Sequence, residues 1–406
     1  MEIRFSSGEV ALPPLLSRMS LGALCWKTKS FVVALLVYGF FGSPTPDAYG
    51  WVELLVGSFL IFSMGVPNVR EDGLFLFVMS VVAFVPMVVG FAHGHDIHDM
   101  VRDLIPFLFL FLYPFYKDPI RELREGSYIL ISIVGFSFSV RALMPYFDHF
   151  DISKGFQLGA PADLLYLANS PEVLFCALWC LVCSFIALFF KGNFPRAVLF
   201  FVLALVPVLS MVFMAQRAGL ASFVLVFGGM VFLLLRTYPM RVLGAVAFLS
   251  VLAVFLGEYI IQIFDLLVRK TQLVGLNSRV QEWDYVLELV FRDWSHAIFG
   301  YGWGMRFENP AVGGIFVLFT HSLLSALLLK TGVLGAGLVF TTLIFIVMKA
   351  FPVLVTRRAL FLVLIFPLLI SGGIYASYKS LGFGLILLVF FEKAHQKLEK
   401  KSVSVA

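Results

Sequence analysis

Two arginines stand out because their positions suit anion binding. Arg217 lies in Met-Ala-Gln-Arg-Ala-Gly-Leu, between two strongly apolar runs with almost no loop between them. A charge at membrane depth is costly and usually functional. The guanidinium is permanently charged and its planar fork matches phosphate oxygens, so the sequence favours an anion site at the outer mouth of a membrane protein. The alternative is an arginine that snorkels to the lipid headgroups.

Arg279 lies in Leu-Asn-Ser-Arg-Val-Gln-Glu-Trp. Asn277 or Ser278 is a suitable N-cap, which would place Arg279 in the first turn of the helix that follows. A cation at a helix start opposes the helix dipole, whereas the N–H groups there attract anions. A bound phosphate would explain the arginine; a solvated loop charge is the alternative.

His321 opens an apolar run in Phe-Thr-His-Ser-Leu-Leu. An imidazole at the boundary between water and hydrocarbon can exchange a proton near neutral pH. The alternative is a histidine that caps or anchors the helix. Gly332 and Gly335 follow on the same expected helix and would allow close helix packing.

Other residues with ligand chemistry give weaker signals. The thiols of Cys176, Cys180 and Cys183 share an apolar run, where cysteine usually acts as a small apolar side chain. The chain has no Gly-x-x-x-x-Gly-Lys-Ser/Thr loop, so ATP-driven transport by this chain alone is not expected. One short turn suits a metal by residue type but not by spacing. A solvated loop is therefore favoured there, and no metal or cofactor is expected. The turn contains His93, His95, Asp96, His98 and Asp99.

The elements that must position these residues are membrane spans. Of the 406 residues, 60% are hydrophobic and 14% are charged, against roughly half and about a quarter in an ordinary soluble domain. A bilayer can solvate such a chain, whereas a soluble core cannot hide so much apolar surface. The net charge of +5 is scattered between apolar runs, so it indicates membrane topology and no nucleic-acid partner.

About 20 helical residues cross a bilayer, and twelve runs are candidates for this. Three of them are short or weakly bounded, so eleven or thirteen spans also fit. The candidate runs are 24–42, 51–67, 74–92, 103–116, 127–143, 173–190, 197–214, 218–235, 242–263, 322–348, 359–374 and 380–392.

Lysine and arginine gather in the N-terminal segment, in alternate connections and in the C-terminal tail, while several opposite connections are acidic. The positive-inside rule therefore predicts a multi-pass protein with both termini in the cytoplasm. We divide the chain into an N-terminal bundle of about nine spans (1–263), a large outer loop (264–320), and C-terminal spans with a cytoplasmic tail (321–406). In the loop, Asn277–Phe291 has helical spacing, and a Gly-x-Gly-x-Gly segment from Gly300 ends any helix.

Three local patterns occur in a fixed order between about Met214 and Phe340. They are Gln216-Arg217-Ala218-Gly219; then Asn277-Ser278-Arg279-Val280-Gln281-Glu282-Trp283, followed by Phe299-Gly300-Tyr301-Gly302-Trp303-Gly304; then His321-Ser322 with Gly332 and Gly335 beyond. This ordered set resembles the O-antigen ligase and O-antigen polymerase superfamily of GT-C-type membrane glycosyltransferases. Ser322 stands where the family more often has Asn, which leaves the branch open.

The resemblance implies an all-α, GT-C-like polytopic fold of about 12 transmembrane helices, with short helices in a large periplasmic loop of a bacterial inner-membrane protein. It implies inverting, metal-independent transfer of an undecaprenyl-pyrophosphate-linked glycan to an acceptor sugar at the periplasmic face. Arg217 and Arg279 would hold the donor pyrophosphate. His321, the third catalytic residue, would activate the acceptor hydroxyl or orient the leaving group. The candidates for lining the cavity are Arg141, Trp283 and Tyr301.

Two acceptors fit this family. A second lipid-linked repeat unit would make the chain an O-antigen polymerase, which we favour, with a chain-length regulator as a further partner. Lipid A–core would make it an O-antigen ligase in lipopolysaccharide biosynthesis. A transporter or flippase is the alternative class, but it predicts related halves and mid-span charges, which the sequence lacks. A non-catalytic assembly scaffold is the third hypothesis.

Overall fold

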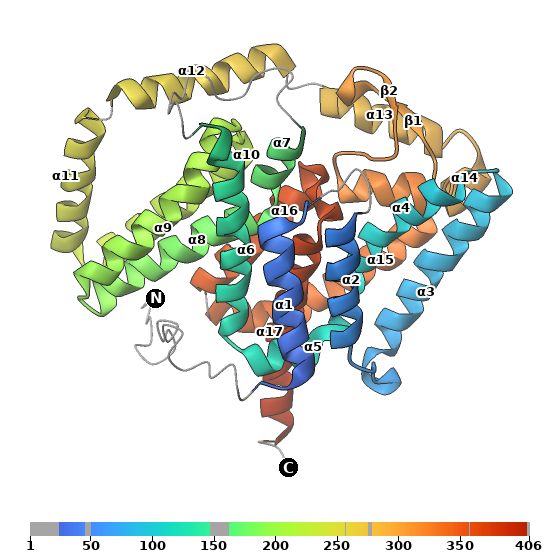
Figure 1. Cartoon of the computed structure of the whole chain (residues 1–406), viewed down its shortest axis with the longest axis horizontal. Coiled ribbons are helices and arrows are strands. Elements are labelled where there is room, and N and C mark those ends of the chain that lie inside the picture. The colour runs from blue at the N-terminus through green and yellow to red at the C-terminus, as the bar shows by residue number, and fades with distance from the viewer. Residues whose placement is uncertain are drawn as a thin grey trace. The chain divides into compact units, whose positions relative to one another are not determined.

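The computed structural model describes residues 24–44, 50–146, 162–255, 257–274, 278–356 and 358–403. The protein is predominantly α-helical, and its apolar helices embed it in a membrane (Figure 1). By length and composition, six of the described helical segments can cross a bilayer. They are α3 (Val69–Ala92), α6 with its 3-10 extension (Gly126–Tyr146), α8 with its π-helical end (Pro171–Phe190), α9 (Phe194–Phe213), α10 (Arg217–Leu235) and the first part of α15 (Leu323–Lys349).

Other helices make up most of the rest of the described chain. Two of them are shorter apolar helices, α2 (Trp51–Ser63) and α16 (Arg358–Gly373). The twelve-span count therefore remains a prediction. The other helices are α1 (Trp26–Phe41), α4 (Ile97–Leu108), α5 (Tyr113–Leu123), α7 (Ala162–Asn169), α11 (Pro239–Phe255), α12 (Gly257–Val274), α13 (Ser278–Val290), α14 (Trp294–Phe299) and α17 (Leu381–Val403).

The predicted span at 103–116 is wrong as a single helix. α4 ends at Leu108, a 3-10 turn η2 (Phe109–Phe111) follows, and α5 begins at Tyr113. Pro114 is the second residue of α5, and proline has no N–H to continue the hydrogen bonding of a preceding helix. The chain therefore breaks here and starts a new helix.

The predicted span at 242–263 is likewise two helices, α11 and α12, with residue 256 outside the described part. α12 begins at Gly257, a residue that weakens a helix interior. It carries Glu258, Asp265, Arg269 and Lys270 among apolar residues. This mixture makes α12 amphipathic, unlike the apolar α11 before it.

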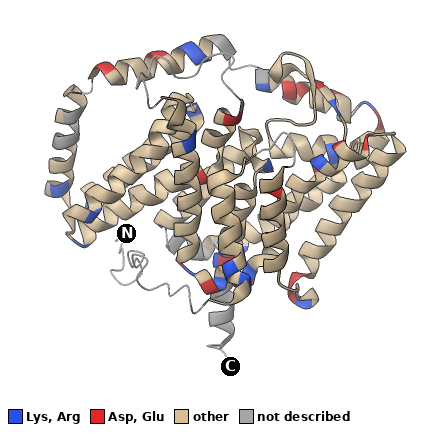
Figure 2. Cartoon of the chain, in the orientation of Figure 1, with Lys and Arg blue, Asp and Glu red and all other residues tan. Residues whose placement is uncertain are grey.

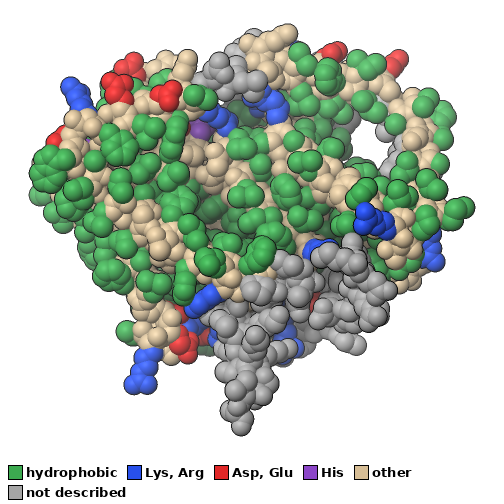
Figure 3. All heavy atoms as spheres, turned by 180° about the vertical axis from the view of Figure 1, so that it is seen from behind, with side chains coloured by type: hydrophobic (Ala, Val, Ile, Leu, Met, Phe, Trp, Pro, Cys, Tyr) green, Lys and Arg blue, Asp and Glu red, His purple; other side chains and the backbone are tan. Residues whose placement is uncertain are grey.

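Charged residues are rare along the apolar helices (Figure 2). On α3, Phe77, Phe84 and Phe91 are exposed and recur every seven residues, so they share one face of the helix. Hydrophobic side chains also spread widely over the molecular face shown in Figure 3. Such an exposed apolar face is costly in water and is solvated by lipid.

Packing divides the chain into two units. Unit 1 contains residues 1–59 and 123–273, and unit 2 contains residues 60–122 and 274–406. The three consecutive segments predicted from the sequence describe membrane topology, and they remain a prediction.

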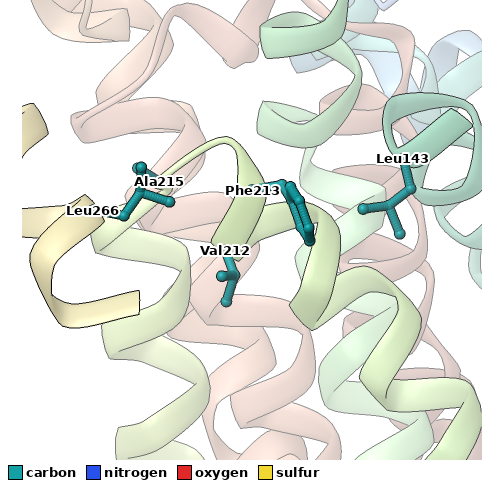
Figure 4. Packing of buried hydrophobic residues seen from close by; sticks show 5 residues of the cluster. All are labelled: Leu143, Val212, Phe213, Ala215 and Leu266. Atoms are coloured by element: carbon teal, nitrogen blue, oxygen red, sulfur yellow. The ribbon is translucent and has the colours of Figure 1, made fainter. Parts of the chain in front are cut away.

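In unit 1, α6, α8 and α9 pack together. At Gly135 of α6, an added Cβ would lie 2.0 Å from the Glu172 carbonyl oxygen, so only glycine allows α8 to approach this closely. A cluster of buried hydrophobic residues joins the ends of α6 and α9 to α12 (Figure 4). Its buried members are Leu143, Val212, Phe213, Ala215 and Leu266.

In unit 2, α15 is the central helix and contacts α3, α13, α14 and α17. It bends at Gly332, whose φ of 63° and ψ of −170° are not helical. An added Cβ there would lie 2.3 Å from the Ile298 carbonyl oxygen. The predicted close approach at Gly332 is therefore confirmed, but it occurs at a kink against the end of α14 and not within a straight helix.

The predicted helix in the outer loop is confirmed as α13, although Asn277 lies outside the described residues. Val286 and Val290 are fully buried against Phe307 and Leu329. The structure adds a short antiparallel hairpin that the sequence analysis missed, formed by β1 (Phe307–Asn309) and β2 (Ile315–Val317). A 3-10 turn η6 (Pro310–Val312) begins the connection between the strands.

Candidate functional site

His321 is held by a buried carboxylate from α13. Its Nδ1 lies 2.7 Å from Glu282 Oε2, and its backbone N–H donates to Glu282 Oε1 at 2.7 Å. The Glu282 side chain is 4% exposed and that of His321 is 21% exposed. A carboxylate that accepts from Nδ1–H fixes the imidazole tautomer and leaves Nε2 as the basic nitrogen. The pair is therefore arranged as a general base with its orienting group.

A third donor completes the environment of Glu282. Asn309, which is fully buried at the end of β1, donates from Nδ2 to Glu282 Oε2 at 2.6 Å and to the Phe319 carbonyl oxygen at 3.2 Å. Burial raises the pKa of the Glu282 carboxyl, but the hydrogen bonds and charge of His321 outweigh burial and hold that pKa below its usual value. Glu282 is thus ionised beside the imidazole at neutral pH.

The start of α15 fixes the backbone of His321. Ser322 Oγ accepts the Ser325 N–H at 3.1 Å, so Ser322 acts as a helix cap. Tyr378 Oη, which is buried, donates to the Thr320 carbonyl oxygen at 3.2 Å. Ser322, which follows His321, therefore caps α15 through its hydroxyl group.

The Gly-x-Gly-x-Gly segment is an extended loop that packs directly on backbone. Gly300, Gly302 and Gly304 have φ values of +71°, +84° and +84°. At Gly302, an added Cβ would lie 2.2 Å from the Gly90 nitrogen of α3. The predicted helix end is confirmed, and glycine is required for the close approach to α3 as well as for the positive φ.

Trp303 donates hydrogen bonds to carbonyl groups of α3 near Pro86. Pro86 has no N–H, so the Val82 carbonyl lacks its helical donor. The indole Nε1–H of Trp303 donates to Val82 O at 3.2 Å, and the Trp303 backbone N–H donates to Pro86 O at 3.0 Å. Trp303 is fully buried. These contacts lock the glycine loop to α3.

A buried ion pair fixes the other side of this loop. Lys330 of α15 bonds Asp103 of α4, and it also donates to the Met305 carbonyl oxygen at 2.5 Å. Asp103 Oδ2 accepts the Gly304 N–H at 3.1 Å. Arg306 binds Asp99 with two bonds of 2.6 and 2.8 Å. The glycine loop that precedes the hairpin is thus held by two ion pairs.

Two further cations lie in this part of unit 2. Arg279, in the first turn of α13, donates to the Ile374 carbonyl oxygen and lies over the Tyr375 ring at 5.4 Å. Because Arg279 and Glu282 are three residues apart, they share one helix face. Lys379 ends the 3-10 turn η7 (Ala376–Lys379) and places its ammonium 4.7 Å from the Phe319 ring centroid.

Lys379 is a second group that can exchange a proton. Burial lowers the pKa of Lys379 to about 7, with the charge of Asp103 acting in the opposite direction. The Phe319 ring, over which this ammonium lies, also contacts the His321 ring edge-on, with centroids 5.9 Å apart. Lys379 and His321 therefore share a neighbour.

Arg217 belongs to unit 1, at the start of α10. Its Nη1 donates to Thr271 Oγ1 of α12 at 2.8 Å. The turn before it is tight: Ala215 has a φ of +49°, and Lys270 donates to the Met214 carbonyl oxygen at 2.8 Å. The predicted absence of a loop between the two apolar runs is confirmed. Among the described residues, this hydrogen bond joins Arg217 to a neutral hydroxyl.

Two of the three residues predicted to line a cavity, Arg141 and Tyr301, donate hydrogen bonds to backbone carbonyl oxygens. Arg141 of α6 donates to the carbonyl oxygens of Gly39 and Gly42 at 3.1 and 2.7 Å, which caps the end of α1. Tyr301 donates to Leu289 O at 3.1 Å. Trp283 is partly buried on α13. Their cavity-lining role remains a prediction.

The predicted solvated turn after α3 is partly ordered by hydrogen bonds. Asp96 caps α4 by accepting the N–H groups of His98 and Asp99 at 2.8 and 3.3 Å. The ligand atoms of Asp96, His98 and Asp99 lie within 4.8 Å of one another. Since Asp99 also binds Arg306, both carboxylates already have protein partners.

Sequence reasoning missed Glu282, although a signal was present. Glu282 lies four and eight residues before Val286 and Val290, so helical spacing puts this carboxylate on the buried face of α13. Asn309, Asp103 and Lys379 gave no such signal, because their roles depend on contacts between segments far apart in the sequence.

No family model, curated protein or solved structure matches this chain.

Proposed function

We propose that this chain is a membrane glycosyltransferase that moves a glycan from undecaprenyl pyrophosphate to an acceptor sugar. The observation that carries the proposal is the pairing of His321 with the buried carboxylate of Glu282, one helical turn from Arg279. A general base with a fixed tautomer beside a phosphate-binding cation is what this transfer requires. The lipid pyrophosphate is proposed as the donor because the ordered sequence patterns resemble the O-antigen ligase and O-antigen polymerase superfamily.

In the proposed reaction, His321 Nε2 accepts the proton of the acceptor hydroxyl. The hydroxyl oxygen attacks the anomeric carbon of the donor sugar, and the bond from that carbon to the pyrophosphate oxygen breaks. One displacement inverts the anomeric configuration. Glu282 stabilises the imidazolium that forms, as carboxylates do for catalytic histidines. Undecaprenyl pyrophosphate leaves with the bonding electrons.

The arginines act on the leaving group. The pyrophosphate gains negative charge as the bond breaks, and a preorganised cation there can lower the barrier by several kcal/mol. We assign this task to Arg279, which lies on the same helix as Glu282; Arg217 is added to it from the resemblance alone. Arg217 suits it because the oxygen to which it donates among the described residues, Thr271 Oγ1, is uncharged. Neither arginine can lose its proton at neutral pH, so His321 is the proposed base.

The proposed setting is the periplasmic face of a bacterial inner membrane. The resemblance implies a GT-C-like fold and the apolar runs of the sequence predict about 12 spans, while the alternation of basic and acidic connections predicts that both termini lie in the cytoplasm. The energy of the donor bond would drive the transfer, so no nucleotide is needed outside the cytoplasm, and the resemblance implies a metal-independent reaction. The proposed acceptor is a second lipid-linked repeat unit, and lipid A–core is the alternative.

The test is a transfer assay with purified protein, undecaprenyl-pyrophosphate glycan, and no nucleotide. Chain growth from that donor alone would support a polymerase. Transfer only after the addition of lipid A–core would support a ligase. Absence of transfer under both conditions, with folded protein that binds the donor, would overturn the proposal and favour a transporter.

A further inference from the structure

We propose that α12 lies in the plane of the membrane surface, with an exposed apolar face in the lipid and a polar face in water. The partner of the apolar face is the bilayer itself, at the depth where acyl chains meet headgroups. The inference concerns unit 1 and does not depend on the proposed glycosyl transfer.

α12 differs from the membrane spans in its charge. Its 18 residues include Glu258, Asp265, Arg269 and Lys270. It is not among the described helices that can cross a bilayer by length and composition. A helix that has an apolar face, a charged face and low net hydrophobicity lies along a membrane surface instead of crossing the membrane.

The packing of α12 places it where spans end. Leu266 is buried in one cluster with Leu143, the last residue of α6, and Phe213, the last residue of α9 (Figure 4). Ile263 and Leu267 pack against the same cluster. Because spanning helices end near the edge of the hydrocarbon layer, the packed side of α12 lies at the boundary between acyl chains and headgroups.

Two hydrogen bonds fix the C-terminal part of α12 at the same level. Arg217, the first residue of α10, donates to Thr271 Oγ1 at 2.8 Å. Lys270 donates at 2.8 Å to the carbonyl oxygen of Met214, which lies in the turn between α9 and α10. A turn between two consecutive spans lies at a membrane surface. α12 is therefore held at that surface by contacts other than those of its apolar residues.

A second side of α12 is apolar and exposed. Ile261, Phe264 and Val268 are 63%, 66% and 38% exposed. They are three and four residues apart, so they share one face of the helix. This face points away from the packed side that contains Leu266. Such a face is costly in water, whereas acyl chains solvate it.

The third side of α12 is polar. Its exposed members are seven, four and three residues apart, so they too lie on one side of the helix. They are Glu258, Asp265, Arg269 and Gln272. This stripe carries both signs of charge, which suits water and zwitterionic headgroups. A helix at the rim of a group of spans meets these three surroundings, namely protein, acyl chains and water.

A second copy of the chain is the other candidate for covering the apolar face. Lipid fits better, because the face lies at the level where α6 and α9 end and α10 begins, and the bilayer already surrounds the spans at this depth. We therefore assign the face to lipid, and the experiment separates the two occupants.

The experiment uses spin labels on full-length protein in vesicles of phosphatidylethanolamine and phosphatidylglycerol. Phe264→Cys and Val268→Cys place labels on the apolar face, and Asp265→Cys and Gln272→Cys are the matched controls on the polar face. The background carries Cys25→Ser, because the other three cysteines are buried. Electron paramagnetic resonance compares the collisions of each label with oxygen, which concentrates among acyl chains, and with a water-soluble nickel complex.

We expect the ratio of oxygen collisions to nickel collisions to be at least about threefold higher for the labels on the apolar face than for those on the polar face. Equal ratios on the two faces would overturn the proposal, because both faces would then have the same surroundings. Immobilised labels on the apolar face that reach neither reagent would also overturn it, in favour of a second copy that covers this face.

A pair of charge substitutions gives a result that does not depend on labels. Phe264→Glu places a carboxylate among acyl chains, whereas Gln272→Glu adds the same charge to the polar face. We expect Phe264→Glu to lower the temperature of thermal unfolding in these vesicles by several degrees and Gln272→Glu to leave it unchanged. Equal unfolding temperatures for the two variants would contradict the proposal, since a face in water tolerates the charge.

Discussion

Several cations of the two units have different kinds of partner. In unit 1, Arg141 and Arg217 donate to uncharged oxygens, those of two helix-end carbonyls and of a threonine hydroxyl. In unit 2, Lys330, Arg306 and Lys117 each face a carboxylate. Opposite charges that pair cancel each other and fix segments in place, whereas a cation on neutral partners keeps its charge. Unit 2 therefore has a scaffold of ion pairs that these cations of unit 1 lack, although Arg279 of unit 2, like Arg217, donates to an uncharged oxygen.

The largest expected difference between the units is in how much stability a glycine substitution removes, because the glycine loop of unit 2 packs directly on backbone. Gly302→Ala puts a Cβ 2.2 Å from the Gly90 nitrogen at a φ of +84°. We expect it to lower the free energy of unfolding by more than about 4 kcal/mol, because backbone cannot yield as a flexible side chain can. Denaturant unfolding in detergent measures this. The control in unit 1 is Gly228→Ala, where nothing lies within 4 Å; an equal loss there would contradict the account.

Removing one member of a buried ion pair should have the next largest effect. Lys330→Met leaves Asp103 charged and buried, and we expect a loss of about 3–5 kcal/mol in the free energy of unfolding. The double variant with Asp103→Leu should recover part of it. Arg141→Met in unit 1 leaves only neutral carbonyls behind, so its loss should be smaller. A larger loss in the free energy of unfolding for Arg141→Met than for Lys330→Met would contradict the difference described between the units.

Arg217 and Glu282 should affect kcat and KM differently. Glu282→Gln removes the charge that stabilises the imidazolium, and we expect kcat for glycan transfer to fall about 100-fold or more with little change in KM. Arg217→Gln should weaken donor binding and so raise KM, in addition to the fall in kcat from lost stabilisation of the leaving pyrophosphate. Steady-state kinetics with varied donor concentration measures both. Identical effects on kcat and KM in the two variants would contradict the division of roles.

The smallest expected effect is a pH dependence in unit 2. The hydrogen bond from Arg306 lowers the pKa of Asp99 below its ordinary value of 3.8, and burial opposes this. The contribution of the ion pair to stability is therefore present above pH 3.8 and is lost as the pH falls further. Unfolding measured between pH 6 and 3 should show a steeper decline for the wild type than for Asp99→Asn. An equal decline of stability with falling pH in both proteins would show that the ion pair of Asp99 and Arg306 contributes nothing to the free energy of unfolding.

The apolar helices were predictable because hydrophobic length is a local property of the sequence. The prediction of single spans at 103–116 and 242–263 was wrong, since mean hydropathy does not register the effect of Pro114 or the amphipathic character of α12. The helix at α13 and the glycine break after α14 followed from spacing and from residue type. The hairpin did not, because its strands are three residues long.

The candidate site was only half predictable. His321 and Arg279 could be selected because their residue types are unusual beside apolar runs. Helical spacing could have indicated that Glu282 is buried, but not that it contacts His321, which lies 39 residues away. The ion pair of Asp103 and Lys330 spans 227 residues and could not be predicted either. Contacts of this kind depend on how helices pack, which one sequence does not specify.

The central claim is that His321 transfers the proton in glycan transfer. The most direct measurement is chain growth from undecaprenyl-pyrophosphate glycan by purified His321→Gln, with Lys379→Gln as the control for the neighbouring titratable group. The account predicts that His321→Gln binds the donor but loses at least about 100-fold in kcat, while Lys379→Gln retains most of its turnover. Full turnover by His321→Gln would contradict the account.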